Sequence, residues 1–141
     1  PAHIHQKMVK KIARKLDQVV EENGLGEVII APFDVFLDEA ENAVQPDIVV
    51  ILKNNPGTFT ETGHFKGVPD LLIEILSQAN RNHDLVRKKA LYERFGVREY
   101  SVVDPESQFC IVFELLDGKY KKSSEAVGLI PSPLLQNQLQ F

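Results

Sequence analysis

The chain has 141 residues, of which 43% are hydrophobic and 26% are charged, and its formal net charge at pH 7 is −4. This length suffices for one domain with a single substantial core, and the composition is that of an ordinary soluble globular protein. No apolar run approaches the roughly 20 residues that a membrane-spanning helix needs, so the sequence excludes a transmembrane helix. The negative charge gives no long-range attraction to nucleic acid, but it is compatible with a local basic patch.

The single cysteine, Cys110, lies in an apolar run typical of a strand. One cysteine allows neither an intrachain disulfide nor a zinc cluster, and we expect it to be a small packed hydrophobic side chain. The first residues, Pro1 to Gln6, show no signal-peptide segment. These features predict a cytoplasmic protein. The missing initiator Met indicates that the native chain begins earlier.

The first predicted element is a helix that ends at the segment 21–24, where Gly24 provides a stop signal. Its apolar stripe consists of Ile4, Met8, Ile12, Leu16, Val19 and Val20. The remaining face carries five cations: Lys7, Lys10, Lys11, Arg14 and Lys15. This face could contact phosphate, although a solvated helix face is the simpler interpretation.

Strands and a second helix follow. We first expect a strand pair or one bent strand over 27–37, with Pro32 at an edge or bulge, and then an acidic turn over 38–42. A buried strand over 47–52, a polar connection over 53–67 and a second buried strand over 70–77 follow. The last predicted elements are a helix over 80–95 closed by Gly96, a third strand over 98–104, and a hairpin of 109–115 with 119–122 around Asp117-Gly118. This order predicts the α/β class, with a mixed central β-sheet flanked by helices.

The segment 123–141 is predicted to be an irregular docking tail, because Pro131-Ser132-Pro133 disfavours regular structure. Its apolar side chains are Leu134, Leu135, Leu139 and Phe141. So many apolar groups are expected to dock against the body of the protein or against a partner subunit, and a homodimer is the expected assembly.

Two carboxylates accompany the most apolar strands. Asp47 directly precedes the run Ile48–Leu52, and Glu74 lies in the middle of the next buried strand. Strand alternation puts Asp70, Leu72 and Glu74 on one face. A buried carboxylate is costly unless a cation or hydrogen-bond donors meet it. Two such acids on neighbouring strands are the minimal ingredients of a divalent-metal site, whereas a structural Glu in an ion pair and a turn residue at Asp47 are the alternatives.

Lys88 belongs to an apolar stripe of the second helix, with Leu85, Tyr92 and Phe95 at spacings of three, four and three. An inward lysine either extends to solvent or meets a buried carboxylate, and Glu74 is the natural partner because the helix follows its strand. The four histidines, His3, His5, His64 and His83, show no metal-binding spacing. A Gly-rich phosphate loop and a serine-hydrolase motif are also absent from the sequence.

Together these blocks resemble the family of putative restriction endonucleases within the PD-(D/E)XK nuclease superfamily. The matching segments are 31–35, 45–50, 67–77, Asp84-x3-Lys88-x3-Tyr92, 96–100 and 103–105, in an order and spacing that match from His5 to about Tyr120. The resemblance implies a restriction-endonuclease-like core as a single domain over residues 1–141. It also implies metal-dependent cleavage of phosphodiester bonds in DNA, without a membrane partner.

Within that resemblance, Asp47 is the acid of the Pro-Asp motif, Glu74 is the second acid and Asp70 is an auxiliary acid. Mg²⁺ or Mn²⁺ would be held by Asp47, Glu74 and the backbone carbonyl of Ile75. The superfamily places a lysine two residues after the second acid, where this chain has Leu76, and this family is similar in carrying it on the following helix, at the position of Lys88.

Three other features depart from the family pattern. Ser101 replaces the usual Trp and Gln78 replaces the usual Pro, neither of which touches the proposed chemistry. The family's N-terminal strands, which normally precede the first helix, are absent here, and this affects the completeness of the sheet but not the site. The alternatives are a non-catalytic nucleic-acid-binding or assembly module on a nuclease fold, and an unrelated sheet protein with a structural Glu–Lys pair.

Overall fold

The computed structural model describes residues 2–77 and 81–141, which form two α-helices, a π-helical turn and twelve strands. In chain order these are α1 (Ala2–Leu16), the π-helical turn (Asp17–Glu21), β1 (Gly26–Ile30), β2 (Val35–Phe36), β3 (Ala43–Val44), β4 (Ile48–Leu52), β5 (Thr58–Phe59), β6 (Phe65–Lys66), β7 (Leu71–Ile75), α2 (Arg81–Phe95), β8 (Glu99–Val103), β9 (Phe109–Leu116), β10 (Lys119–Val127), β11 (Leu129–Ser132) and β12 (Asn137–Gln140). Within the described residues 2–77 and 81–141, no helix is long and apolar enough to cross a membrane.

The central sheet has six strands in the order β1-β4-β7-β8-β9-β10. Only β7 and β8 pair in parallel, and the other neighbours are antiparallel. Two parallel neighbours need a crossover, which α2 supplies between them. All five residues of β7 are buried, as expected for a strand covered on both faces. The predicted mixed sheet flanked by helices is therefore confirmed.

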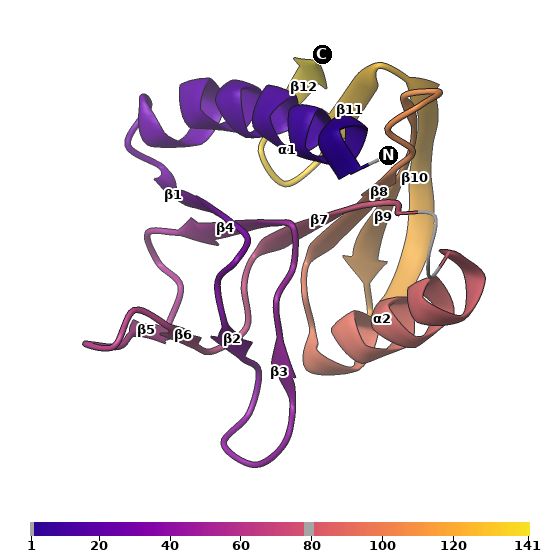
Figure 1. The fold of residues 1–141 in the computed structure, drawn as a ribbon. Coiled ribbons are helices and arrows are strands. Elements are labelled where there is room, and N and C mark those ends of the chain that lie inside the picture. The colour runs from indigo at the N-terminus through magenta and orange to yellow at the C-terminus, as the bar shows by residue number, and fades with distance from the viewer. Residues whose placement is uncertain (1, 78–80) are drawn as a thin grey trace.

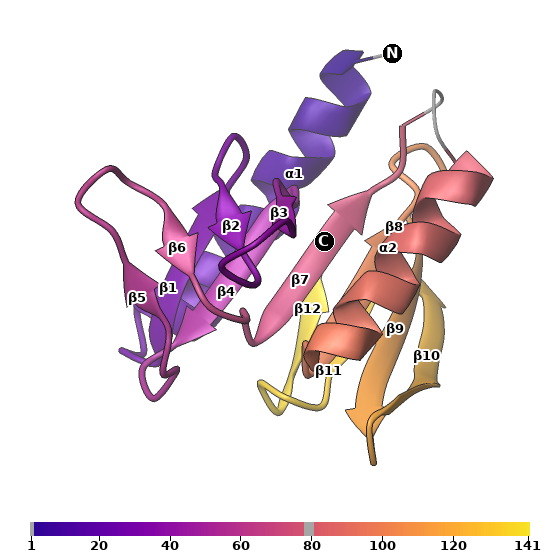
Figure 2. The same ribbon diagram turned by 90° about the horizontal axis from the view of Figure 1, so that it is seen from below.

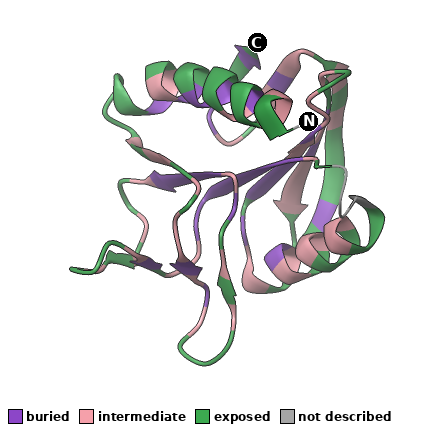
Figure 3. Ribbon diagram, viewed as in Figure 1, coloured by how far each residue is buried: buried purple, intermediate pink, exposed green. Residues whose placement is uncertain are grey.

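Each face of the sheet has its own hydrophobic core (Figures 1 and 2). On one face α1 packs with Met8, Ile12 and Leu16, together with the C-terminal hairpin β11–β12. The opposite face is covered by α2 and by a second, four-stranded sheet in the order β3-β2-β6-β5. The purple buried segments in Figure 3 gather in β4 and β7, which lie between the two layers.

The small sheet corrects two expectations. The predicted strand pair over 27–37 is split, because β1 belongs to the central sheet and β2 to the small one, with Pro32 between them. The segment 53–67, expected to be a polar connection, contains the paired strands β5 and β6. Phe65 explains why, since its side chain is fully buried in the core and pulls this segment onto the body.

The tail from Ser123 was expected to be irregular, and this prediction is wrong. β10 continues to Val127, and β11 and β12 form an antiparallel hairpin with Pro131 opposite Gln138. A two-stranded ribbon has an unpaired edge on each strand, where proline costs no ladder hydrogen bond. Ile130 and Leu139 are buried against the α1 side of the core, so the tail docks on its own chain and gives no support for a homodimer.

A buried carboxylate fixes this tail. Glu99, on β8, is fully buried and accepts hydrogen bonds from the Ser132 hydroxyl at 2.7 Å and from the Leu134 backbone N–H at 3.0 Å. Burial raises the pKa of Glu99 above its ordinary value, although these two hydrogen bonds oppose that shift. The carboxylate therefore links the central sheet to the turn between β11 and β12.

We predict opposite effects for two substitutions of Glu99. Glu99→Ala should lower the free energy of unfolding by about 2–4 kcal/mol, because it leaves two donors without an acceptor. Glu99→Gln keeps an acceptor and removes the charge. Ionising a carboxyl whose pKa is raised in the folded state costs stability as pH increases above 4.5, so the Gln variant should gain stability relative to wild type over that range.

Urea unfolding of both variants from acidic to neutral pH measures these effects, with Glu106→Gln at an exposed position as the control. A Gln variant that becomes less stable relative to wild type with increasing pH would contradict the assignment.

Candidate functional site

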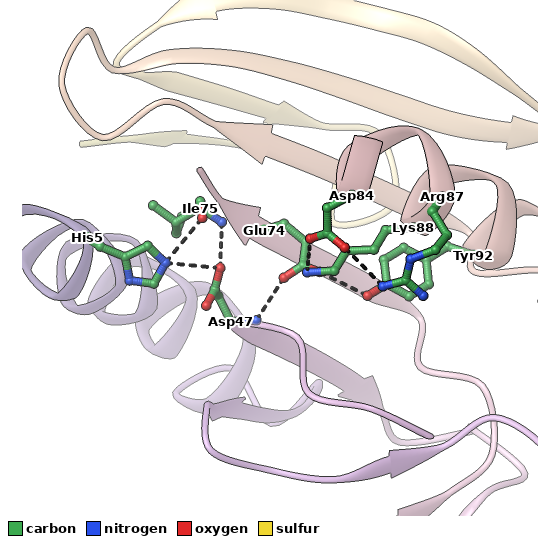
Figure 4. A network of polar contacts seen from close by, with 8 residues as sticks. All are labelled: His5, Asp47, Glu74, Ile75, Asp84, Arg87, Lys88 and Tyr92. Atoms are coloured by element: carbon green, nitrogen blue, oxygen red, sulfur yellow. Dashed lines mark hydrogen bonds and ion pairs between the residues drawn. The ribbon is translucent and has the colours of Figure 1, made fainter. Parts of the chain in front are cut away.

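The pairing of β4 with β7 brings the two acids of the sequence together. The strands are antiparallel, and Ile48 lies opposite Ile73. One step further along the same ladder, Asp47 at the start of β4 faces Glu74 near the end of β7. The two acids therefore lie on neighbouring strands at one end of the central sheet, as expected from the sequence (Figure 4).

Asp47 and the end of β7 are joined by reciprocal contacts. The Asp47 backbone N–H donates to Glu74 Oε1 at 3.2 Å, and the Ile75 N–H donates to Asp47 Oδ2 at 2.7 Å. His5 of α1 reaches the same place, with Nε2 at 3.4 Å from Asp47 Oδ2 and 3.2 Å from the Ile75 carbonyl oxygen. Two elements distant in sequence, α1 and β7, thus converge on the Asp47 carboxylate.

Glu74 is buried and is met by the second helix. Its Oε2 lies 3.0 Å from Lys88 Nζ and accepts a hydrogen bond from the Tyr92 hydroxyl at 3.0 Å. Burial raises the pKa of Glu74; the Lys88 ammonium opposes this and the nearby Asp47 carboxylate adds to it. Glu74 therefore has the electrostatic environment of a functional carboxylate, buried and facing both a cation and a second acid.

Lys88 lies between two carboxylates. Its ammonium is 3.0 Å from Glu74 and 3.1 Å from Asp84, which also pairs with Arg87. Burial by itself lowers the pKa of Lys88, but the charges of Glu74 and Asp84 outweigh burial and raise it. The inward direction expected from the helical spacing is therefore observed. Lys89, the next residue, instead lies over the Phe113 ring at 4.2 Å.

The family model named Uma2, described as a putative restriction endonuclease, matches residues 1–141. The chain belongs to this family. The fold is similar to the crystal structure of a putative nuclease belonging to DUF820 from Anabaena variabilis, with a TM-score of 0.72 and 19% identity over 94% of this chain and 74% of that chain. A search of curated proteins found no match.

Oxygen atoms of Asp47, Glu74 and Ile75 lie at this end of the sheet, where the resemblance described above places a divalent metal ion. In residues 2–77 and 81–141, no three or more side chains of His, Cys, Asp and Glu are grouped as a metal site. The Asp47 carboxylate nevertheless contacts the Ile75 backbone N–H, and Glu74 Oε1 contacts the Asp47 backbone N–H, so the oxygen atoms of both acids lie near this end of the two strands (Figure 4). Oxygen donors of these kinds are the ligands that Mg²⁺ and Mn²⁺ prefer, so the residues present fit such an ion.

His5 was missed by the sequence analysis, which searched only for histidines at metal-binding spacings. A usable signal existed: His5 is three residues before Met8 and seven before Ile12, both of which are buried under α1. The same helical spacing that identified Lys88 therefore places the imidazole on the inner face of its helix.

Asp70 lies at the opposite end of β7, away from the other predicted site residues. Its Oδ2 accepts hydrogen bonds from the Leu52 N–H at 2.8 Å and from the Asn55 side-chain amide at 2.9 Å, and Arg98 lies 3.9 Å from Oδ1. These contacts connect the end of β4 to the start of β7. They give Asp70 a structural task in holding the two strands in register.

We predict that Asp70→Ala destabilises the fold by about 1–3 kcal/mol, because two donors lose their acceptor, while Mn²⁺ affinity stays unchanged. Urea unfolding and calorimetric titration with Mn²⁺ measure the two effects, and Glu61→Ala on an exposed segment is the matched control. A tenfold loss of Mn²⁺ affinity in a folded Asp70→Ala variant would instead show that Asp70 is an auxiliary acid of the site.

Proposed function

We propose that this chain is a metal-dependent endonuclease that hydrolyses phosphodiester bonds of DNA. The supporting observation is the contact between the buried Glu74 carboxylate and Lys88 at 3.0 Å, beside Asp47, at one end of the sheet. Membership of a family described as a putative restriction endonuclease supports phosphodiester hydrolysis as the reaction. The family, and not any contact of these residues, favours DNA over RNA.

Asp47, Glu74 and the carbonyl of Ile75 are the groups that would hold Mg²⁺ or Mn²⁺. When bound, such an ion supplies a water of lowered pKa and positive charge against the phosphate. Hydrogen bonds hold both carboxylates in place: the Tyr92 hydroxyl donates to Glu74 Oε2, and the Ile75 N–H donates to Asp47 Oδ2. Both carboxylates are therefore positioned before substrate arrives.

Lys88 acts as a positive group and not as a base, because its raised pKa keeps it protonated. Its ammonium has three N–H donors, two of which can be used by Glu74 and Asp84. The third can donate to a phosphate oxygen or to the attacking water. A positive charge aimed at a phosphate stabilises the negative charge that develops in the transition state.

We expect Lys88→Ala to lower the rate of plasmid cleavage with Mn²⁺ by about 10²–10³, the usual loss for one positioned electrostatic group. Lys89→Ala should be nearly neutral, because Lys89 lies over Phe113 outside the site. The measurement is the conversion of supercoiled plasmid to nicked and linear forms. Asp47→Asn and Glu74→Gln, purified identically, exclude a contaminating nuclease if both are inactive.

Two outcomes would contradict this proposal. An equal loss in the Lys88 and Lys89 variants would indicate general attraction of phosphate and remove the role of Lys88. A wild-type protein that binds DNA but cleaves none with either ion would favour the alternative function, a non-catalytic nucleic-acid-binding or assembly module on a nuclease fold.

A further inference from the structure

Three electronegative atoms converge where α1 meets the ends of β4 and β7. His5 Nε2 lies 3.4 Å from Asp47 Oδ2 and 3.2 Å from the Ile75 carbonyl oxygen. Both oxygens are acceptors, and an imidazole nitrogen without its hydrogen is an acceptor as well. Such a group repels itself unless a hydrogen or a cation lies among its members. The hydrogen of an Nε2–H tautomer can fill this position in the protein without metal, and a metal cation can take the place of that hydrogen.

We propose that His5 is a protein ligand of the metal ion, through Nε2, beside Asp47 and the Ile75 carbonyl. The inference rests on the proposed nuclease site and adds a nitrogen donor to the oxygen donors. It makes α1 part of the site, although this helix lies on the opposite face of the sheet from α2 (Figure 1).

The separations are those of atoms that share one metal ion. For bonds of about 2.1 Å, two neighbouring ligands are about 3.0 Å apart in an octahedral site and about 3.4 Å apart in a tetrahedral one. The two separations of Nε2, 3.4 and 3.2 Å, both fall within this interval. His5 Nε2 is therefore at a suitable distance from each of the two oxygens to share an ion with it.

The fold holds His5 in this place. Met8 and Ile12, which follow on the same helical face, are buried in the core and fix the rotation of α1. The His5 side chain is 27% exposed, so its inner nitrogen faces the site while the ring remains partly open to solvent. His3, on the same helix, is exposed and has no such contacts among the described residues.

A nitrogen ligand changes which ions the site prefers. Mg²⁺ is a hard ion that favours oxygen ligands, whereas imidazole suits transition metals. A site with His5, Asp47 and a backbone carbonyl should therefore prefer Mn²⁺ to Mg²⁺ more strongly than the carboxylates alone would. The ratio of the two affinities reports on His5 separately from the presence of the site.

The test uses the full chain without DNA. Calorimetric titration with Mn²⁺ and with Mg²⁺ compares wild type, His5→Ala, His3→Ala and Asp47→Asn, and pulsed electron paramagnetic resonance of bound Mn²⁺ detects a directly coordinated nitrogen. We expect His5→Ala to weaken Mn²⁺ binding by at least about tenfold and Mg²⁺ binding by less, and to abolish the nitrogen coupling. His3→Ala should match wild type.

The outcomes separate this inference from the proposed function. If Asp47→Asn loses Mn²⁺ while His5→Ala binds it as wild type does, or if wild type shows no nitrogen coupling, His5 is no ligand and the carboxylate site stands. If wild type binds no Mn²⁺, both proposals fail. The spectrum of wild-type protein decides the matter even if His5→Ala does not fold.

Discussion

The structure is organised around one costly group, the carboxylate of Glu74 inside the central sheet. A buried charge is tolerated only where donors surround it, and here they come from different elements: the Asp47 N–H at the start of β4, and Lys88 and Tyr92 on α2. Satisfying Glu74 therefore sets where β4 begins relative to β7 and which face α2 presents to the sheet. The same requirement gathers the residues of the candidate site.

Three buried carboxylates, Glu99, Asp70 and Glu74, differ in the groups that surround them. Glu99 is met by a hydroxyl and a backbone N–H, and Asp70 by a backbone N–H and an amide, with Arg98 at 3.9 Å. Glu74 differs in its direct contact with an ammonium, that of Lys88 at 3.0 Å, beside the Asp47 carboxylate. Two acids near each other are electrostatically unfavourable, and a cation bound by both would relieve that cost.

A layer of packed aromatic side chains adjoins the candidate site. The Tyr92 ring packs edge to face with Tyr100 at 5.2 Å, and Tyr100 stacks with Phe113 at 6.0 Å. These contacts fix α2 on the sheet, so the hydroxyl that holds Glu74 is itself held by packing. The Lys89 ammonium lies over the Phe113 ring of the same layer. Core packing and site geometry are in this way carried by the same residues.

Local patterns in the sequence were sufficient to predict much of this arrangement. Alternation along β7 placed Glu74 on its face, and the spacing of Leu85, Tyr92 and Phe95 turned Lys88 inward, because side-chain direction follows from the geometry of a single element. The order of the elements was sufficient to predict the mixed sheet and its two helices. It did not predict the strands of the tail or of the small sheet.

Only the tertiary structure decided those strands, since Pro131 and Phe65 acquire their roles from pairing and burial that involve distant segments. The position of His5 was decided in the same way. The sequence shows a histidine on a helix, but its approach to Asp47 and Ile75 depends on how α1 packs across β4 and β7. The sequence by itself determined which residues carry charge into the core and in which direction each points along its own element. Which of them meet was decided by long-range packing, because contacts across 42 and 70 positions, such as those of His5, leave no periodic trace in the sequence.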